Sequence, residues 1–250
     1  MRAMSDHPSG KSRPALLSAD VPASPSPSTG WRRLLAAVPR AALGNLVAKL
    51  AIMGLGLGIT VMVARQGPKV QGAFALFVAI ESGLLTLFSG LGLWLARQMS
   101  RQAGGEWQRS LPLLQGVLRA VVALGLLASL ALLGVSWWAD ALPYSQLWLL
   151  AIGAPFLLLV PTATGLWLGE GRMWPINLAQ VAAPALVLGG LAAVTTFQEG
   201  ATRHTPTVVL VLVAWVAGKS LVGVLTAIRA LQHAGQRDAH MAGELHTTRI

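Results

Sequence analysis

Six long apolar segments dominate this sequence and limit what it can fold into. Short polar or turn-forming segments separate them, and they cover residues 41–64, 71–96, 113–136, 146–168, 175–197 and 207–231. A helix needs about 20 residues to cross the ~30 Å apolar core of a bilayer, and each segment is long enough. Only 11% of the residues are charged, against about 25% in a soluble domain. The sequence therefore predicts an all-α membrane protein with six transmembrane helices.

The two ends of the chain differ in composition from this transmembrane domain of residues 41–231. Residues 1–29 are rich in Pro and Ser and predict a disordered tail. Residues 30–40 combine apolar side chains at helical spacing with arginines, which is typical either of a basic amphipathic helix at the membrane surface or of a positively charged flank. No short apolar run with a cleavage site precedes residue 41, so we expect the first span to be retained. Residues 232–250 predict a polar tail.

Lysine and arginine are distributed unevenly between the two sides of the predicted bundle. If the N-terminus is cytoplasmic, thirteen of the 19 Lys and Arg residues lie in cytoplasmic segments and three lie in outer loops. The positive-inside rule then places both termini in the cytoplasm. This topology explains most of the net charge of +10, so we expect no nucleic-acid partner. Most tryptophans fall near span ends, as interfacial Trp does, but Trp215 lies inside the sixth span.

Ionisable residues inside a span are costly, roughly 2.5–3.5 kcal/mol each on insertion scales, and are candidates for function. Glu81 and Lys219 each have about ten or more residues of their span on either side. They form either an ion pair that fixes helix packing or a titratable or substrate-binding pair in a transport pathway. The second interpretation predicts that neutralising either residue abolishes transport while the protein still inserts. Arg119 lies near a span end and can extend to the lipid headgroups.

A second candidate group lies in the first span. Asn45, Lys49, Gly56 and Thr60 share one face of the predicted helix. Lys49 is close enough to the inner end to reach the lipid headgroups, and the polar stripe equally favours the wall of a cavity.

Glycine and proline predict how the helices pack. Two pairs have the GxxxG spacing that allows helix backbones to approach closely in lipid, Gly54 with Gly58 and Gly165 with Gly169. Prolines inside spans predict bends, at Pro155, Pro161 and Pro184.

Residues needed for common membrane enzymes are absent from the predicted spans. The five histidines lie outside the predicted spans, and the spans contain no Asp. The chain has no Cys and no phosphate-binding loop motif. The sequence therefore predicts no catalytic residues, no metal site and no cofactor, and it favours a protein that is not an enzyme.

Several short motifs carry a resemblance to a known family. Asn45 to Lys49 and an apolar run precede Val63-Ala64-Arg65-Gln66-Gly67-Pro68 and Gly72-Ala73-Phe74-Ala75-Leu76. Further on come Ser89-Gly90-Leu91-Gly92-Leu93 before Arg97, and Gly169-Glu170-Gly171-Arg172 before Asn177. Over residues 41 to about 180 the chain resembles the bacterial polysaccharide and O-antigen flippases of the multidrug/oligosaccharidyl-lipid/polysaccharide exporter superfamily.

The resemblance implies a function and a set of site residues. Such flippases translocate a polyprenyl-pyrophosphate-linked glycan across the bacterial inner membrane by alternating access, in lipopolysaccharide and other polysaccharide biosynthesis. Their two six-helix lobes surround a central cavity. From their positions, we would then expect Lys49, Arg65 and Lys219 to contact the pyrophosphate. Glu81 would act as a coupling or gating carboxylate, and Asn45 is a further candidate for the substrate cavity.

Six spans match only one lobe of such a transporter. We therefore expect a homodimer or a separate partner lobe, unless the chain is a truncated and inactive product. Two other functions fit the same sequence: a non-transporting scaffold of envelope polysaccharide assembly, and a permease subunit for a small solute. Neighbouring genes would separate them, because a permease subunit needs an ATPase or a substrate-binding protein.

Overall fold

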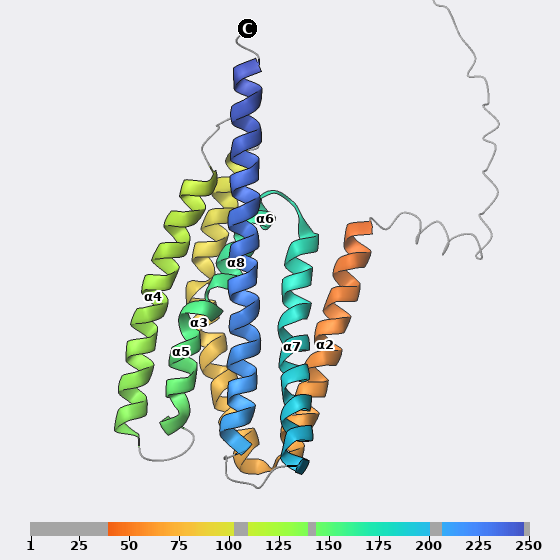
Figure 1. Cartoon of the computed structure of the whole chain (residues 1–250), viewed down its shortest axis with the longest axis vertical. Helices are drawn as coiled ribbons and strands as arrows, with labels where there is room; N and C mark the ends of the chain where they lie inside the picture. Colours follow the sequence, from red (N-terminus) through yellow and green to blue (C-terminus); the bar gives the residue numbers. More distant parts are fainter. Residues whose placement is uncertain (1–39, 103–109, 140–143, 201–206, 248–250) are drawn as a thin grey trace, which may run out of the picture. The chain divides into compact units, whose positions relative to one another are not determined.

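The computed structural model describes residues 40–102, 110–139, 144–200 and 207–247, and these residues form helices joined by short turns. The predicted tail of residues 1–29 and nearly all of the predicted surface segment 30–40 lie outside the described residues. The helices, labelled in Figure 1, are α2 (Arg40–Arg65), α3 (Pro68–Gln102), α4 (Ser110–Trp138), α5 (Leu147–Leu157), α6 (Leu159–Gly169), α7 (Met173–Gly200) and α8 (Thr207–Thr247), with a 3₁₀ turn at Tyr144–Gln146 before α5.

Within the described residues, six helical segments are long and apolar enough to cross a membrane, as expected of a multi-pass membrane protein. They are Ala42–Arg65, Pro68–Arg101, Ser110–Trp138, Tyr144–Gly169, Met173–Thr196 and Thr207–Met241. All six predicted spans are confirmed as helices. The helices alternate in direction, so α2 begins and α8 ends at the same end of the bundle (Figure 1). We call this the Arg40 end and the other the Arg65 end; the sequence predicts that the Arg40 end is cytoplasmic.

The fourth span is interrupted at Leu158, between α5 and α6. Pro161 has no N–H to donate to the carbonyl of Leu157, four residues earlier, so the helical ladder breaks there. Pro155 leaves the carbonyl of Ala151 without its usual donor in the same way. Ser129 Oγ of α4 donates to that carbonyl at 2.5 Å. The prolines thus interrupt this span as predicted, whereas α7 continues through Pro184.

One of the two predicted GxxxG pairs makes a close helix crossing. Gly165 and Gly169 of α6 face Gly92 and Ala96 of α3. A Cβ on Gly165 would collide with the Gly92 carbonyl oxygen, and one on Gly169 would lie 2.6 Å from the Ala96 carbonyl oxygen. Gly54 has open space at its Cβ position, and Gly58 would make only ordinary contact with a leucine. The pair in α2 therefore makes no such crossing.

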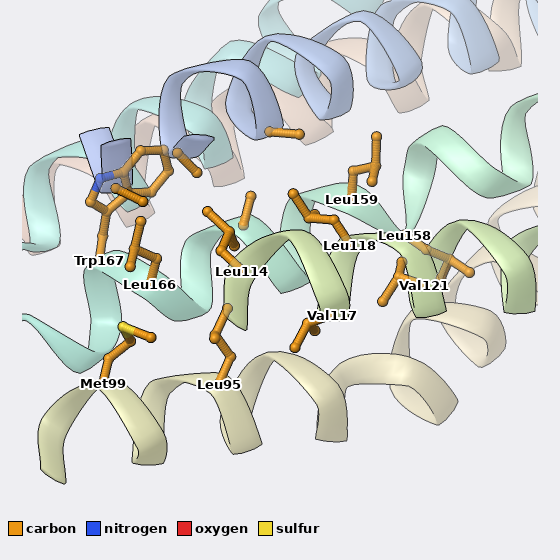
Figure 2. Packing of buried hydrophobic residues seen from close by; sticks show 14 of the residues in the cluster. Leu95, Met99, Leu114, Val117, Leu118, Val121, Leu158, Leu159, Leu166 and Trp167 are labelled. Carbon is orange, nitrogen blue, oxygen red and sulfur yellow. The ribbon is translucent and has the colours of Figure 1, made fainter. Parts of the chain in front are cut away.

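Two apolar cores hold the bundle together, one in each half. The Arg65-end core joins α2, α3, α5, α7 and α8 through residues such as Ile59, Val63, Phe77, Leu191 and Leu212. The Arg40-end core joins α3, α4, α6 and α8, with Ile176 of α7 at its edge. Figure 2 shows its side chains from α3, α4 and α6 in contact. Helix α2 contributes no residue to the Arg40-end core, so it is tied to the other helices mainly near the Arg65 end.

Helix α8 extends well beyond the predicted end of the sixth span at residue 231, through much of the segment predicted as a polar tail. Polar contacts hold this extension against the rest of the bundle. Asp238 accepts hydrogen bonds from the N–H groups of Ser110 and Leu111 at 3.0 Å each and from Ser110 Oγ at 2.7 Å. A carboxylate at these positions stabilises the N-terminus of α4, where backbone N–H groups lack helical partners.

The turn between α6 and α7 is held by the same extension of α8. Glu170 accepts a hydrogen bond from Arg237 Nη1 at 2.8 Å and lies 2.8 Å from His233 Nε2. Gly171 has a φ of 71°, a left-handed conformation that favours glycine at this tight turn. The start of α7 is therefore fixed to α8 at the Arg40 end.

Candidate functional site

A cavity of about 760 Å³ lies in the Arg40 half of the bundle. Residues of α2 and α7 form one wall, and residues of α3 and α5–α6 form the opposite wall, with Lys219 of α8 at its deep end. Its volume lies within the range of small-molecule binding sites. Four of the five predicted site residues line it: Asn45, Lys49, Glu81 and Lys219. They come from three helices that are far apart in the sequence.

The fifth predicted site residue, Arg65, is not brought to this cavity. It is the last residue of α2, at the opposite end of the bundle, and its side chain is exposed. Only part of the predicted polar stripe of the first span lines the cavity. Asn45 and Lys49 line the cavity, whereas Thr60 donates to the Gly56 carbonyl at 2.9 Å and does not. Only the part of α2 near the Arg40 end therefore contributes to the cavity.

Glu81 and Lys219 form an ion pair that joins α3 to α8. Lys219 Nζ lies 2.6 Å from Oε1 and 2.8 Å from Oε2 of Glu81. Glu81 is only 3% exposed. Trp215 Nε1 donates to Oε2 at 2.8 Å, and the ammonium lies 3.7 Å from the centre of the Trp215 ring. Trp215 is thus a buried partner of this pair, which explains why it does not follow the interfacial pattern of the other tryptophans.

The charged atoms of both Glu81 and Lys219 have partners among the described residues. Both carboxylate oxygens accept hydrogen bonds, and the ammonium also makes a cation–π contact. Phe74 packs edge-on against Trp215, with ring centres 4.7 Å apart. The two opposite charges cancel at short range, which reduces the cost of placing them among apolar helices. The geometry brings the pair together as both interpretations of the sequence require.

The wall formed by α2 and α7 carries amides and an uncompensated cation. Lys49 Nζ donates to Gln180 Oε1 at 3.0 Å. Lys49 has no carboxylate partner among the residues that the structure describes. Asn177 is only 6% exposed, lines the cavity, and its amide has no hydrogen-bond partner within the described ranges. Together with Asn45, these side chains present N–H donors to the cavity.

The opposite wall carries hydroxyl groups whose hydrogens are already used. Thr86 donates to the Ser82 carbonyl at 2.7 Å, Ser89 to the Thr86 carbonyl at 2.8 Å, and Thr164 to the Val160 carbonyl at 2.8 Å. Each hydroxyl oxygen keeps a lone pair that can accept another hydrogen bond. Leucines and other apolar side chains lie between them. The α2–α7 wall carries an ammonium and amides, which offer N–H donors as well as carbonyl acceptors, and we call it the donor wall. The hydroxyl groups of the opposite wall are left as acceptors.

Gln180 is a cavity residue that the sequence pattern did not predict, and Asn177 was predicted only as part of a motif. A single amide in an apolar span gives little signal by itself, because it costs less than a charge and occurs in many membrane helices. The available signal was their spacing of three residues, which places both on one face of α7.

The described residues contain no cluster of side chains suited to bind a metal ion. No group of three or more His, Cys, Asp or Glu is arranged there to hold a metal ion. That the chain is not an enzyme and uses no metal or cofactor stays a prediction.

Comparison of the chain with protein-family models, with curated proteins and with solved structures finds no match.

Proposed function

We propose that this chain is a transport protein of the bacterial inner membrane that translocates a lipid-linked glycan, as its resemblance to polysaccharide flippases implies. One observation carries the proposal. Four of the five residues selected from sequence line a single cavity within a bundle of membrane-spanning helices. The cavity combines polar walls, which suit a glycan and its phosphate, with apolar side chains, which suit a lipid.

The packing of the bundle also supports alternating access. In the Arg65 half, the side chains of α2 and α7 pack with those of α3 and α8 in the Arg65-end core. In the Arg40 half, the cavity lies between α2 and α3, whereas the start of α7 stays close to α8. This arrangement corresponds to a state in which the binding site is reached from the Arg40 side. Transport requires a second state in which the Arg65-end core opens.

A second lobe completes the proposed transporter, either as a second copy of the chain or as a different protein. Both lobes can have the same orientation, because an even number of spans returns the chain to its starting side. Chemical crosslinking and native mass spectrometry measure the assembly directly. A strictly monomeric protein that still transports would contradict this part of the proposal.

Transport is tested with purified protein in vesicles that contain a fluorescent lipid-linked glycan. A membrane-impermeant reductant then reports how much of the probe has crossed the bilayer. Ser89→Phe places a bulky ring in the cavity and should stop transport, because the substrate has to occupy that space. Ser82→Phe is the matched control: it lies on the same helix, is exposed and does not line the cavity.

The proposal fails if wild-type protein moves no lipid-linked glycan, or if Ser89→Phe transports it as fast as Ser82→Phe. A non-transporting scaffold would tolerate both substitutions in polysaccharide assembly. A small-solute permease subunit would move no lipid and would depend on an ATPase.

A further inference from the structure

The charge of the cavity limits what its ligand can be. Two cations line it, Lys49 and Lys219. Lys219 is already matched by Glu81, at 2.6 Å. Lys49 contacts only the neutral amide of Gln180 within the described residues. The described lining therefore has one uncompensated positive charge, and that charge lies on the donor wall of α2 and α7.

Asn177 adds an amide to the same wall of the cavity. It is almost completely buried, yet its amide makes no hydrogen bond within the described part of the chain. Among the described residues, Ser220 Oγ is the buried side-chain polar atom without a partner. The Asn177 amide instead reaches the space of the cavity, where a ligand or water can bind it. It lies three residues before Gln180, which Lys49 contacts, so it belongs to the same wall.

From these observations we propose that Lys49, Asn45, Asn177 and Gln180 bind one phosphodiester group of an amphipathic, hydroxyl-bearing ligand. The phosphate oxygens accept hydrogen bonds from the ammonium and the amides of the donor wall. The hydroxyl groups of the ligand donate to Thr86, Ser89 and Thr164 on the opposite wall. This inference rests on the proposed function and narrows it, because the resemblance alone implies a pyrophosphate with two charges.

A second phosphate charge lacks a counter-ion among the described residues that line the cavity. Lys219 is the other cation of the lining, and its ammonium is held by both oxygens of Glu81. A dianionic ligand would have to break this pair and leave the Glu81 carboxylate unpaired, or stay uncompensated itself, and either is costly in an apolar bundle. The structure therefore favours a single phosphodiester.

The test uses full-length protein in detergent and two lipid ligands that differ by one phosphate. The same sugar is attached to the same polyprenol through a monophosphate, which makes a phosphodiester, or through a pyrophosphate. Binding is titrated by native mass spectrometry, with phosphatidylglycerol as a bilayer phosphodiester and phosphatidylcholine as a lipid without net charge. We expect the monophosphate-linked sugar to bind at least as tightly as the pyrophosphate-linked sugar, and phosphatidylcholine to bind weakly.

Lys49→Met should weaken binding of the monophosphate-linked sugar by about tenfold or more, because a hydrogen bond to a charged group is lost. Lys49→Arg should keep most of the affinity. Lys69→Met is the matched control, since Lys69 is also exposed but lies at the Arg65 end and does not line the cavity. An unchanged unfolding temperature in Lys49→Met excludes loss of the fold as the cause.

Equal binding by Lys49→Met and Lys69→Met would overturn the inference, as would tenfold tighter binding of the pyrophosphate-linked sugar or no binding of any phosphodiester lipid. The proposed function fails separately. If the wild-type protein binds the phosphodiester through Lys49 but moves no glycan lipid across vesicles, the site stands and the transport function falls. If phosphatidylglycerol binds as tightly as the monophosphate-linked sugar, the site again stands and the transport function falls. The ligand is then a bilayer phospholipid. If a Lys49→Met variant transports the glycan lipid normally, the transport function stands and the proposed phosphodiester site falls.

Discussion

Glu81, Lys219 and Trp215 form a unit in which each polar atom depends on the others. The carboxylate receives the ammonium and the indole N–H, and the ammonium lies over the indole ring. Removal of one charge leaves the other without compensation among apolar helices, which is far more costly than removal of both. The unit thus ties α3 to α8 at the deep end of the cavity.

We predict that Glu81→Gln lowers the stability of the protein by about 1–3 kcal/mol, because it leaves the partly buried Lys219 ammonium without its carboxylate. The double variant Glu81→Gln/Lys219→Met removes both charges and should recover most of this loss. Thermal unfolding in detergent, followed by the fluorescence of Trp, measures both variants. A double variant no more stable than the single one would contradict the prediction.

Transport by the same double variant decides between the two interpretations of the pair. Because Lys49 carries the uncompensated charge of the described cavity lining, we expect the double variant to keep transport. Loss of transport in a stable double variant would assign the pair a direct role in the pathway.

Some glycines of this chain lie where two helices touch, and others face open space. The sequence does not distinguish the two kinds, and the structure does. The crossing of α3 and α6 leaves no room for a Cβ on Gly92, where the nearest atom is the Pro161 carbonyl oxygen. Gly90, two residues earlier on the same helix, has open space at that position. Since the obstacle at Gly92 is backbone, the helices have to move apart to accept a methyl group.

We predict that Gly92→Ala lowers the free energy of unfolding by about 1–3 kcal/mol, the usual cost of overpacking a close contact. Gly90→Ala should leave it unchanged or raise it by up to about 1 kcal/mol, because alanine is the better helix former. Thermal unfolding of the two variants under identical detergent conditions gives the comparison. Equal destabilisation by both would show that the crossing is not the cause.

At the same scale, the sequence was sufficient for some elements and insufficient for others. Hydropathy located all six spans, because each has to match the bilayer thickness with apolar residues. It did not predict the extension of α8, since the helix there depends on contacts of Asp238 and Arg237 with distant residues. Periodicity placed Asn45 and Lys49 on one face. It could not show that Gln180, more than a hundred residues away, completes that wall.

For the whole molecule, the arrangement of the helices gives the two ends different roles. The Arg65 end is closed by an apolar core, and the Arg40 end holds the cavity, the polar contacts of α8 and the fixed start of α7. The distribution of Lys and Arg predicts which end faces the cytoplasm. A ligand made in the cytoplasm would then reach the cavity directly.

The natural chain has no cysteine, so single introduced thiols report the orientation without interference. We predict that Gln236→Cys and the cavity variant Thr86→Cys react with a membrane-impermeant maleimide in inside-out vesicles and are protected in intact spheroplasts. Lys69→Cys, at the Arg65 end, should show the reverse, because the positive-inside rule places that end outside. Labelling of Lys69→Cys only in inside-out vesicles would invert the topology. In that case the cavity of this state would open to the outside, and the substrate would be taken up from the outer side of the membrane.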